Sequence, residues 1–214
     1  MSTGGRSAGR AALLILMSAA LVALWRWAAS ELLSPHAAFA ASFVLLGLVP
    51  AAGAALWGRK PSCLGLRAGD ARQGLRWLLL LAPIMLAAAH VAAHDPAVAA
   101  VYPLAKNACG GPLPFGWHCV LYLLFYIGWE FQFRGFLLFG LRDVLGAAPA
   151  IAIQALLSAA AHAGKPPAEI WGALAAGVLW GALALRTRSL LSGLLQHALL
   201  GIALDYLLCF GPTW

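Results

Sequence analysis

The apolar C-terminal half of this sequence contains four polar residues whose types and spacing suit hydrolysis: Glu130, Arg134, His162 and His197. An ionisable residue at the centre of a membrane-spanning helix costs roughly 2.5–3.5 kcal/mol on insertion scales, so it is normally paired or functional. Arg134 follows Glu130 by four positions and therefore projects from the same helix face. Taken alone, Glu130 and Arg134 could form a structural ion pair, and each histidine could be a structural residue. One carboxylate and two histidines in neighbouring segments together favour a catalytic site.

Two hydrolytic chemistries fit a glutamate and two histidines. Two imidazoles and one carboxylate complete the ligand set of a hydrolase-type zinc site. Without a metal, a glutamate and one histidine act as general bases on a water while the second histidine donates to the oxyanion. The helical zinc signature HExxH does not occur in the sequence. We expect no cofactor, but the spacing alone leaves zinc open as the alternative.

The segments that must position these residues are strongly apolar. Hydrophobic residues make up 63% of the 214 positions and charged residues 10%, whereas soluble domains have about 45–50% and about 25%. We therefore predict an all-α, polytopic transmembrane bundle of about seven spans, with six to eight as the range. The runs that predict these spans lie near residues 11–29, 37–58, 74–93, 115–140, 148–164, 168–185 and 189–210.

The basic residues predict the orientation of the bundle. With seven spans and a cytoplasmic N-terminus, three of the 14 Lys and Arg residues (Arg26, Lys106 and Lys165) fall on the outer side and the other eleven on or toward the cytoplasm. This asymmetry follows the positive-inside rule and predicts a multi-pass protein of the plasma or inner membrane. The net charge of +7 then reflects basic residues that face the anionic lipid headgroups of the bilayer. It does not indicate a nucleic-acid partner. The first apolar run reads as an uncleaved span.

The chain divides by content into two parts. Residues 1–114 are expected to form an N-terminal scaffold of three spans, and residues 115–214 a core of four spans that holds the buried polar candidates. The four cysteines are scattered without a CxxC pair, so we expect them to be free. A disulfide between Cys109 and Cys119 is conceivable from their proximity in sequence.

Helix rise predicts which polar residues share a depth. Glu130 lies about ten residues before the end of its span and His197 about nine residues after the start of its own, so both stand roughly 15 Å from the same membrane face. His162 falls further out. Asp205, eight positions after His197, is on the same helix face two turns on, and we treat it as a supporting residue without direct contact to His197. His118, near the start of its span, is ambiguous.

The order of these residues resembles the CAAX-protease and bacteriocin-processing family of intramembrane endopeptidases. Residues 129–135 (Trp-Glu-Phe-Gln-Phe-Arg-Gly) resemble its first motif, EExxxR followed by Gly. Residues 158–162 (Ser-Ala-Ala-Ala-His) stand where its second motif, FxxxH, would fall. His197 stands at the histidine of its third motif, HxxxN. The resemblance covers residues 115–210.

The resemblance implies a glutamic-type intramembrane endopeptidase, in a family formerly classed as metalloproteases. In that family the motif-one Glu and the motif-two His activate a water, and the motif-three His and Asn stabilise the oxyanion. By position, Glu130 and His162 would activate the water and His197 would donate to the oxyanion. Arg134 would hold the site geometry, and Asp205 would assist. The partner implied is a membrane-anchored protein substrate.

Three positions depart from the family pattern. Trp129 occupies the first Glu position, Ser158 replaces Phe, and Gly201 replaces the Asn of the third motif. The Trp-Glu dyad with Phe-Arg-Gly resembles the myxosortase-like branch, which implies a C-terminal sorting tail as the substrate instead of a prenylated CAAX protein.

Two other functions remain as alternatives. An inactive relative acting as a membrane binding or immunity partner would explain the changes at Trp129 and Gly201. A proton-coupled transporter would use Glu130, Asp205 and the histidines as a relay. A relay requires a polar stripe across several spans, whereas the polar residues are expected near one level.

Overall fold

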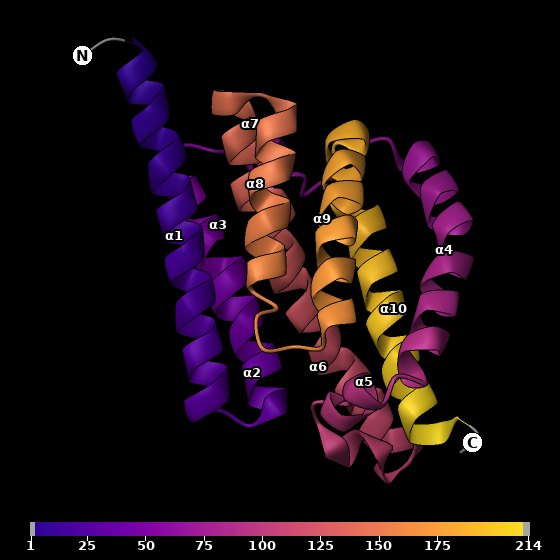
Figure 1. Ribbon diagram of the computed structural model, residues 1–214. Coiled ribbons are helices and arrows are strands. Elements are labelled where there is room, and N and C mark those ends of the chain that lie inside the picture. The colour runs from indigo at the N-terminus through magenta and orange to yellow at the C-terminus, as the bar shows by residue number, and fades with distance from the viewer. Residues whose placement is uncertain (1–2, 212–214) are drawn as a thin grey trace.

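The protein is an all-α bundle, as predicted. The computed structural model describes residues 3–211, with side chains from residue 7, and this part of the chain contains helices and no strand. The long rods stand side by side, with the N-terminus and the C-terminus at opposite ends of the bundle (Figure 1). The helices that make up the rods are α1 (Thr3–Glu31), α2 (Pro35–Ser42), η1 (Phe43–Leu48), α3 (Val49–Leu56), α4 (Ala71–Ala93), α6 (Pro112–Glu130), η4 (Phe131–Leu138), α7 (Phe139–Leu145), α8 (Ala147–Ala160), α9 (Pro167–Thr187) and α10 (Leu191–Phe210).

Each of the predicted apolar runs corresponds to one helix or to one unbroken series of helices. Five helices among the described residues are long and apolar enough to cross a membrane: residues 7–31, 35–56, 71–93, 167–187 and 191–210. The run at 148–164 becomes the shorter apolar helix α8. The chain is therefore a multi-pass helix bundle. Short helices, η2 (Pro61–Leu64), α5 (Pro96–Val101) and η3 (Lys106–Gly110), lie in the two long connections.

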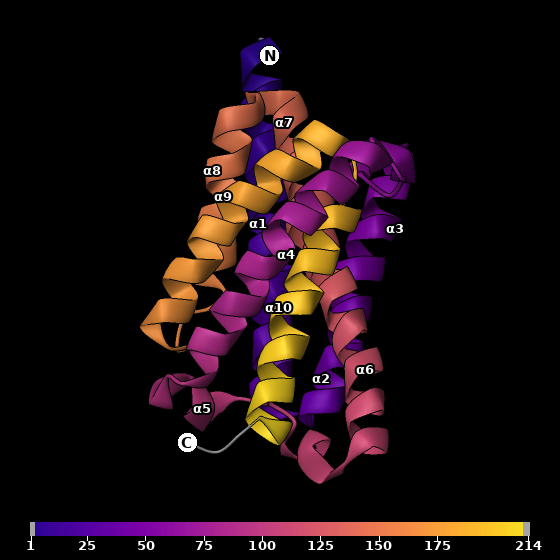
Figure 2. The ribbon, with the colours of Figure 1, turned by 90° about the vertical axis from the view of Figure 1, so that its right-hand side faces the viewer.

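The rod made by α6, η4 and α7 is the centre of the bundle. Every side chain of the π-helical segment η4 is buried, and the rod packs against α1, α2, α8, α9 and α10. At Gly128, a Cβ would lie 2.4 Å from the carbonyl oxygen of Ser42. The glycine therefore allows the backbones of α6 and α2 to meet directly before the motif that begins at Trp129. Helix α4 lies at the edge of the bundle beside α10 (Figure 1, Figure 2).

Capping residues start the helices that follow the loops. The Ser34 side chain accepts a hydrogen bond from the backbone N–H of Ala37 at the start of α2. Asp70 does the same for Gln73 in α4. Such caps satisfy backbone donors that the first helical turn leaves without partners. The tight turn between α7 and α8 has Gly146 at a φ of 85°, a conformation that glycine adopts at low cost.

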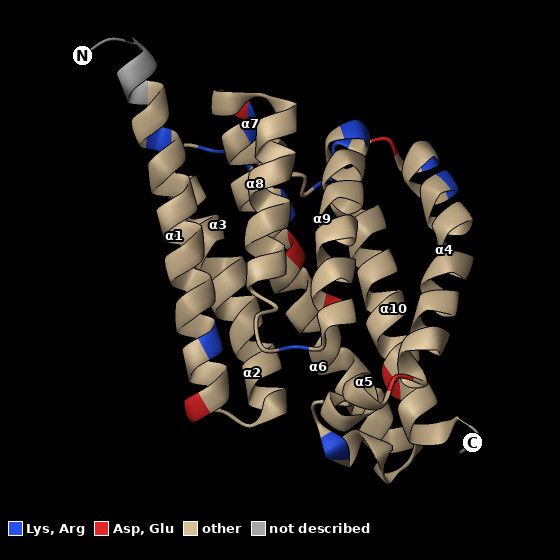
Figure 3. Ribbon diagram, viewed as in Figure 1, with Lys and Arg blue, Asp and Glu red and all other residues tan. Residues whose placement is uncertain are grey.

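The two ends of the bundle differ in charge and in covalent structure. Lys and Arg gather at the end that carries the α7–α8 turn and the start of α4 (Figure 3). At the opposite end a disulfide joins Cys109 in η3 to Cys209 in α10. The prediction of four free cysteines was therefore wrong for this pair, because the fold brings together two segments 100 residues apart in sequence. Cys63 and Cys119 are free.

Candidate active site

Glu130 is the hub of the candidate site. It is the last residue of α6 and is 1% exposed. Its Oε1 accepts a hydrogen bond from Arg134 Nη1 at 3.2 Å and lies 2.8 Å from His197 Nδ1. The two side chains predicted to share one depth, Glu130 and His197, are thus in direct contact. A carboxylate held between an arginine and a histidine is charge-compensated, which allows it to stay buried in an apolar bundle.

The contact with Glu130 sets the orientation of the His197 ring. An ionised carboxylate only accepts hydrogen bonds, so Nδ1 of His197 carries the hydrogen. The other ring nitrogen, Nε2, is therefore the end available for chemistry. The His197 side chain is 16% exposed, against 2% for Glu130, so the histidine is the more accessible member of the pair.

Aromatic side chains hold the His197 ring on two sides. Its centroid lies 4.6 Å from the ring of Tyr126 and 4.7 Å from that of Trp180. The guanidinium of Arg134 also lies over Trp180, at 5.6 Å. Trp180 is fixed in turn, because its Nε1 donates to Gln196 Oε1 at 3.0 Å. One aromatic ring on α9 therefore orders both partners of Glu130.

His162 lies apart from this cluster, in the turn after α8. Its Nδ1 is 2.8 Å from the carbonyl oxygen of Ser158. A carbonyl can only accept, so Nδ1 donates and Nε2 of the neutral ring keeps its lone pair. The ring packs at 5.2 Å against Trp129, the residue at the first Glu position of the motif. No hydrogen bond or ion pair joins His162 to Glu130 or His197, all three of which are described.

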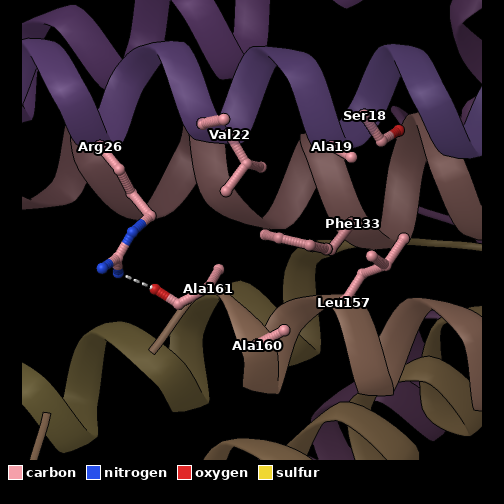
Figure 4. A pocket seen from close by; sticks show the side chains of 9 residues that line it. Ser18, Ala19, Val22, Arg26, Phe133, Leu157, Ala160 and Ala161 are labelled. Carbon is pink, nitrogen blue, oxygen red and sulfur yellow. Dashed lines mark hydrogen bonds between the residues drawn. The ribbon is translucent and has the colours of Figure 1, made fainter. Parts of the chain in front are cut away.

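Arg26 anchors the turn that carries His162, and sequence reasoning missed this role. Its guanidinium donates to the carbonyl oxygens of Ala161 and Ala163, the latter at 2.8 Å. Figure 4 shows the bond to Ala161 at one end of a groove of about 340 Å³ between α1 and α8. The groove is lined by Ser18, Ala19, Val22, Ala23, Arg26, Phe133, Leu157, Ala160 and Ala161. The sequence showed only an arginine at the end of an apolar run. A basic residue at the end of a membrane span is equally well explained by its position outside the bilayer core.

Asp205 belongs to a second polar cluster. Its Oδ2 lies 2.8 Å from His118 Nε2, and His118 Nδ1 lies 3.3 Å from His36 Nε2. Asp205 and His118 are fully buried. Asp205 is thus placed two turns from His197, as its spacing indicated, and its partner is the histidine whose role was ambiguous.

The polar side chains extend along α6 instead of gathering at one level, which corrects the expectation from sequence. His118, Tyr122, Tyr126, Glu130 and Arg134 recur every four residues and are all buried. This spacing places them on one helix face. They face α10, which carries His197, Gly201 and Asp205. The line escaped notice because two of its members are tyrosines, which count as apolar residues in a hydropathy pattern.

The residues present do not fit a metal centre. Among the described residues, no group of three or more His, Cys, Asp or Glu side chains is arranged to hold a metal ion. A hydrolase-type zinc site needs three protein ligands around one point. We therefore derive no step through a metal.

Comparison with known families identifies the C-terminal half. Residues 111–203 match the family described as type II CAAX prenyl endopeptidase Rce1-like. This segment is therefore similar to that family. It runs from the start of α6 into α10 and contains Glu130, His162 and His197, so the resemblance drawn from the motifs is confirmed. The match indicates a protease, and together with the long apolar helices it indicates one that acts at the membrane. No curated protein and no solved structure matches the chain.

Proposed function

We propose that the protein is an intramembrane endopeptidase that hydrolyses a peptide bond of a membrane-anchored protein. The observation that carries this proposal is the contact of Glu130 with both Arg134 and His197 inside a bundle of apolar helices. These residues lie within the segment that matches an endopeptidase family, at the positions that resemble its first and third motifs. A buried charged cluster of this kind is expensive in a membrane and is normally kept for function.

In the proposed mechanism, Glu130 and His162 activate a water. Each residue has one atom free to accept a proton. His162 donates from Nδ1 to the Ser158 carbonyl, which leaves the lone pair on Nε2. Glu130 uses Oε1 for its contacts with Arg134 and His197, and its Oε2 receives no hydrogen bond from a described residue. The water oxygen bonds to the scissile carbonyl carbon while its proton passes to this pair. The proton is then delivered to the leaving amine as the C–N bond breaks. In this mechanism the water and the scissile peptide bond lie between Glu130 and His162.

His197 is proposed to stabilise the oxyanion. Its Nδ1 donates to Glu130, so donation from Nε2 requires the doubly protonated ring. Glu130 lies 2.8 Å from that ring and compensates its positive charge. As negative charge develops on the carbonyl oxygen, it meets a fixed donor in a site of low dielectric, where such interactions are strongest.

The proposed substrate is a C-terminal sorting tail, and the N-terminal part is proposed to be a scaffold. The Trp129-Glu130 dyad supports a sorting tail as the substrate, because it resembles the myxosortase-like branch that processes such tails. The hydrogen bonds from Arg26 to the turn that carries His162 support the scaffold role, since they link residues 1–114 to the core.

We propose that the protein resides in the plasma or inner membrane with its N-terminus in the cytoplasm. Two independent features support this orientation. The basic residues gather at one end of the bundle (Figure 3), as the positive-inside rule requires for the cytoplasmic side. The disulfide Cys109–Cys209 lies at the other end, and disulfides persist in oxidising compartments outside the cytoplasm.

The test is cleavage of a co-expressed protein that carries a candidate tail. Glu130→Gln and His162→Ala should each abolish cleavage while the protein accumulates normally in the membrane. Glu31→Gln is the matched control, because Glu31 is an exposed acid at the end of α1. Continued cleavage by either site variant would overturn the proposed mechanism.

The polar line from His118 to Arg134 favours proton-coupled transport as a second candidate function. A relay would depend on Asp205, whose Oδ1 is buried and has no partner among the described residues. Asp205→Asn should then abolish proton movement in reconstituted vesicles. In the protease, the same variant should retain cleavage whenever the bundle still assembles.

A further inference from the structure

The third motif lacks its asparagine, and the structure shows what fills that space. Gly201 lies one helical turn after His197 on α10. A Cβ at Gly201 would lie 1.7 Å from the hydroxyl oxygen of Tyr126 and 2.8 Å from its Cζ. The Tyr126 hydroxyl therefore occupies the volume in which any side chain at position 201 would begin. Tyr126 in this position and a side chain at 201 exclude each other.

The Tyr126 side chain lies against both His197 and Gly201 of α10. The two rings are in contact, with centroids 4.6 Å apart. Tyr126 also precedes Glu130 by one turn on α6, so its side chain lies on the helix face that presents the carboxylate. A phenolic O–H is a neutral hydrogen-bond donor, as the amide of asparagine is.

We propose that Tyr126 is a catalytic residue that donates the second hydrogen bond to the oxyanion, in place of the missing asparagine. This inference rests on the proposed endopeptidase function. The hydroxyl donates without losing its proton, so no bond to Tyr126 forms or breaks. Oxyanion holes use more than one donor aimed at the developing charge, and tyrosine hydroxyls serve as such donors.

Tyr122 holds the hydroxyl of Tyr126 in position. Their rings lie 4.5 Å apart. Tyr122 is itself stacked on Phe39 of α2, at 4.7 Å. Tyr122 is therefore a positioning residue, and the ordered pair avoids reorganisation when charge develops.

The inference changes the meaning of the glycine at 201. Read from sequence, Gly201 suggested a lost donor and a relative without activity. In the structure, Gly201 and Tyr126 are one arrangement, because only glycine leaves room for the hydroxyl. The donor has moved from α10 to α6.

The first experiment removes the hydroxyl alone. Tyr126→Phe keeps the ring against His197, and kcat for cleavage of the tail substrate should fall by about 100-fold with little change in KM. Tyr206→Phe is the matched control, since Tyr206 is an exposed tyrosine on α10, and it should leave kcat unchanged. A folded Tyr126→Phe variant with kcat within about twofold of the unmodified protein would overturn the inference.

The second experiment exchanges the donor. Gly201→Asn alone should be inactive because its Cβ collides with Tyr126. Combining it with Tyr126→Leu makes room for the asparagine, and this double variant should cleave at least about tenfold faster than Tyr126→Leu alone. A folded double variant no faster than Tyr126→Leu would count against exchange of one donor for another. If the unmodified protein cleaves no tail while a known active endopeptidase does, the proposed function has failed; the outcomes above concern Tyr126 alone.

Discussion

The ring of Trp129 packs edge-on against His162, with centroids 5.2 Å apart and an interplanar angle of 76°, while the next residue turns its carboxylate to His197. Consecutive helical residues point about 100° apart, so the two positions of the Trp-Glu dyad face two different histidines. The dyad thus divides the site into an apolar contact at His162 and a charged contact at His197.

This arrangement predicts that Trp129 acts through its ring. Trp129→Phe should keep His162 in place, and it removes an indole N–H that is buried without a partner among the described residues. Such a donor costs about 1–3 kcal/mol, so we expect unchanged or higher thermal stability and near-normal cleavage. Trp129→Ala should lose about 3–5 kcal/mol through the cavity that it leaves. Thermal unfolding in detergent, with a cleavage assay, measures both; an inactive but stable Trp129→Phe variant would show that the indole N–H itself is needed.

The charged contact predicts activity without a metal. Glu130 is already occupied by Arg134 and His197, and the described residues offer no three-ligand group. Cleavage by the purified protein should therefore persist in excess chelator. Metal analysis of the same sample supplies the control. Loss of activity in chelator that returns with added zinc would contradict the glutamic mechanism.

Some features of the site followed from the sequence because helix geometry is constant. A fixed rise per residue was enough to place Glu130 and His197 at one depth, and they are in contact. The apolar runs likewise predicted the rods, because polar backbone groups in a membrane are satisfied most simply by helices. The π-helical segments η1 and η4 were not predicted, since no residue pattern in those runs distinguishes them from α-helix.

Other features depended on which helices are neighbours, and depth alone does not give this. The pairs Asp205–His118 and Cys109–Cys209 both join α10 to segments about 90–100 residues earlier. Tyr126 was missed for a related reason: its role appears only when Gly201 is seen to lie opposite its hydroxyl. Pairings of this kind arise from side-chain packing across an interface, which a single sequence does not record.

Arg26 gives a prediction about the first span. Arg26→Met removes the hydrogen bonds to Ala161 and Ala163 that hold the His162 turn. Hydrogen bonds from a charged donor contribute about 1.5–3 kcal/mol, so cleavage should fall by roughly tenfold or more while the bundle still assembles. Limited proteolysis at the turn should increase in parallel. Arg186→Met is the matched control because Arg186 lies at the opposite end of the bundle and bonds to Gln73; an equal loss there would point to a general effect of charge removal.

The cysteines predict a labelling pattern that tests the orientation. In intact cells, reduction followed by a membrane-impermeant thiol reagent should label Cys109 and Cys209, which are disulfide-bonded at the end opposite the basic residues. Cys63 is a free, exposed cysteine between α3 and α4, and it should react only after the membrane is opened. A Cys63→Ser variant shows which signal is which. Labelling of Cys63 in intact cells would reverse the proposed orientation.

The buried ion pair separates structural from catalytic roles. Arg134→Met leaves the Glu130 carboxylate without its arginine, and breaking a buried pair in this way should cost about 3–5 kcal/mol. Adding Glu130→Gln removes the uncompensated charge, so the double variant should recover most of the lost stability. It should not recover cleavage, because a neutral amide at this position cannot compensate a doubly protonated His197 or accept the proton of water. Thermal unfolding and cleavage assays on the three variants complete the cycle. A double variant that is both stable and active would show that Glu130 and Arg134 form a structural pair only.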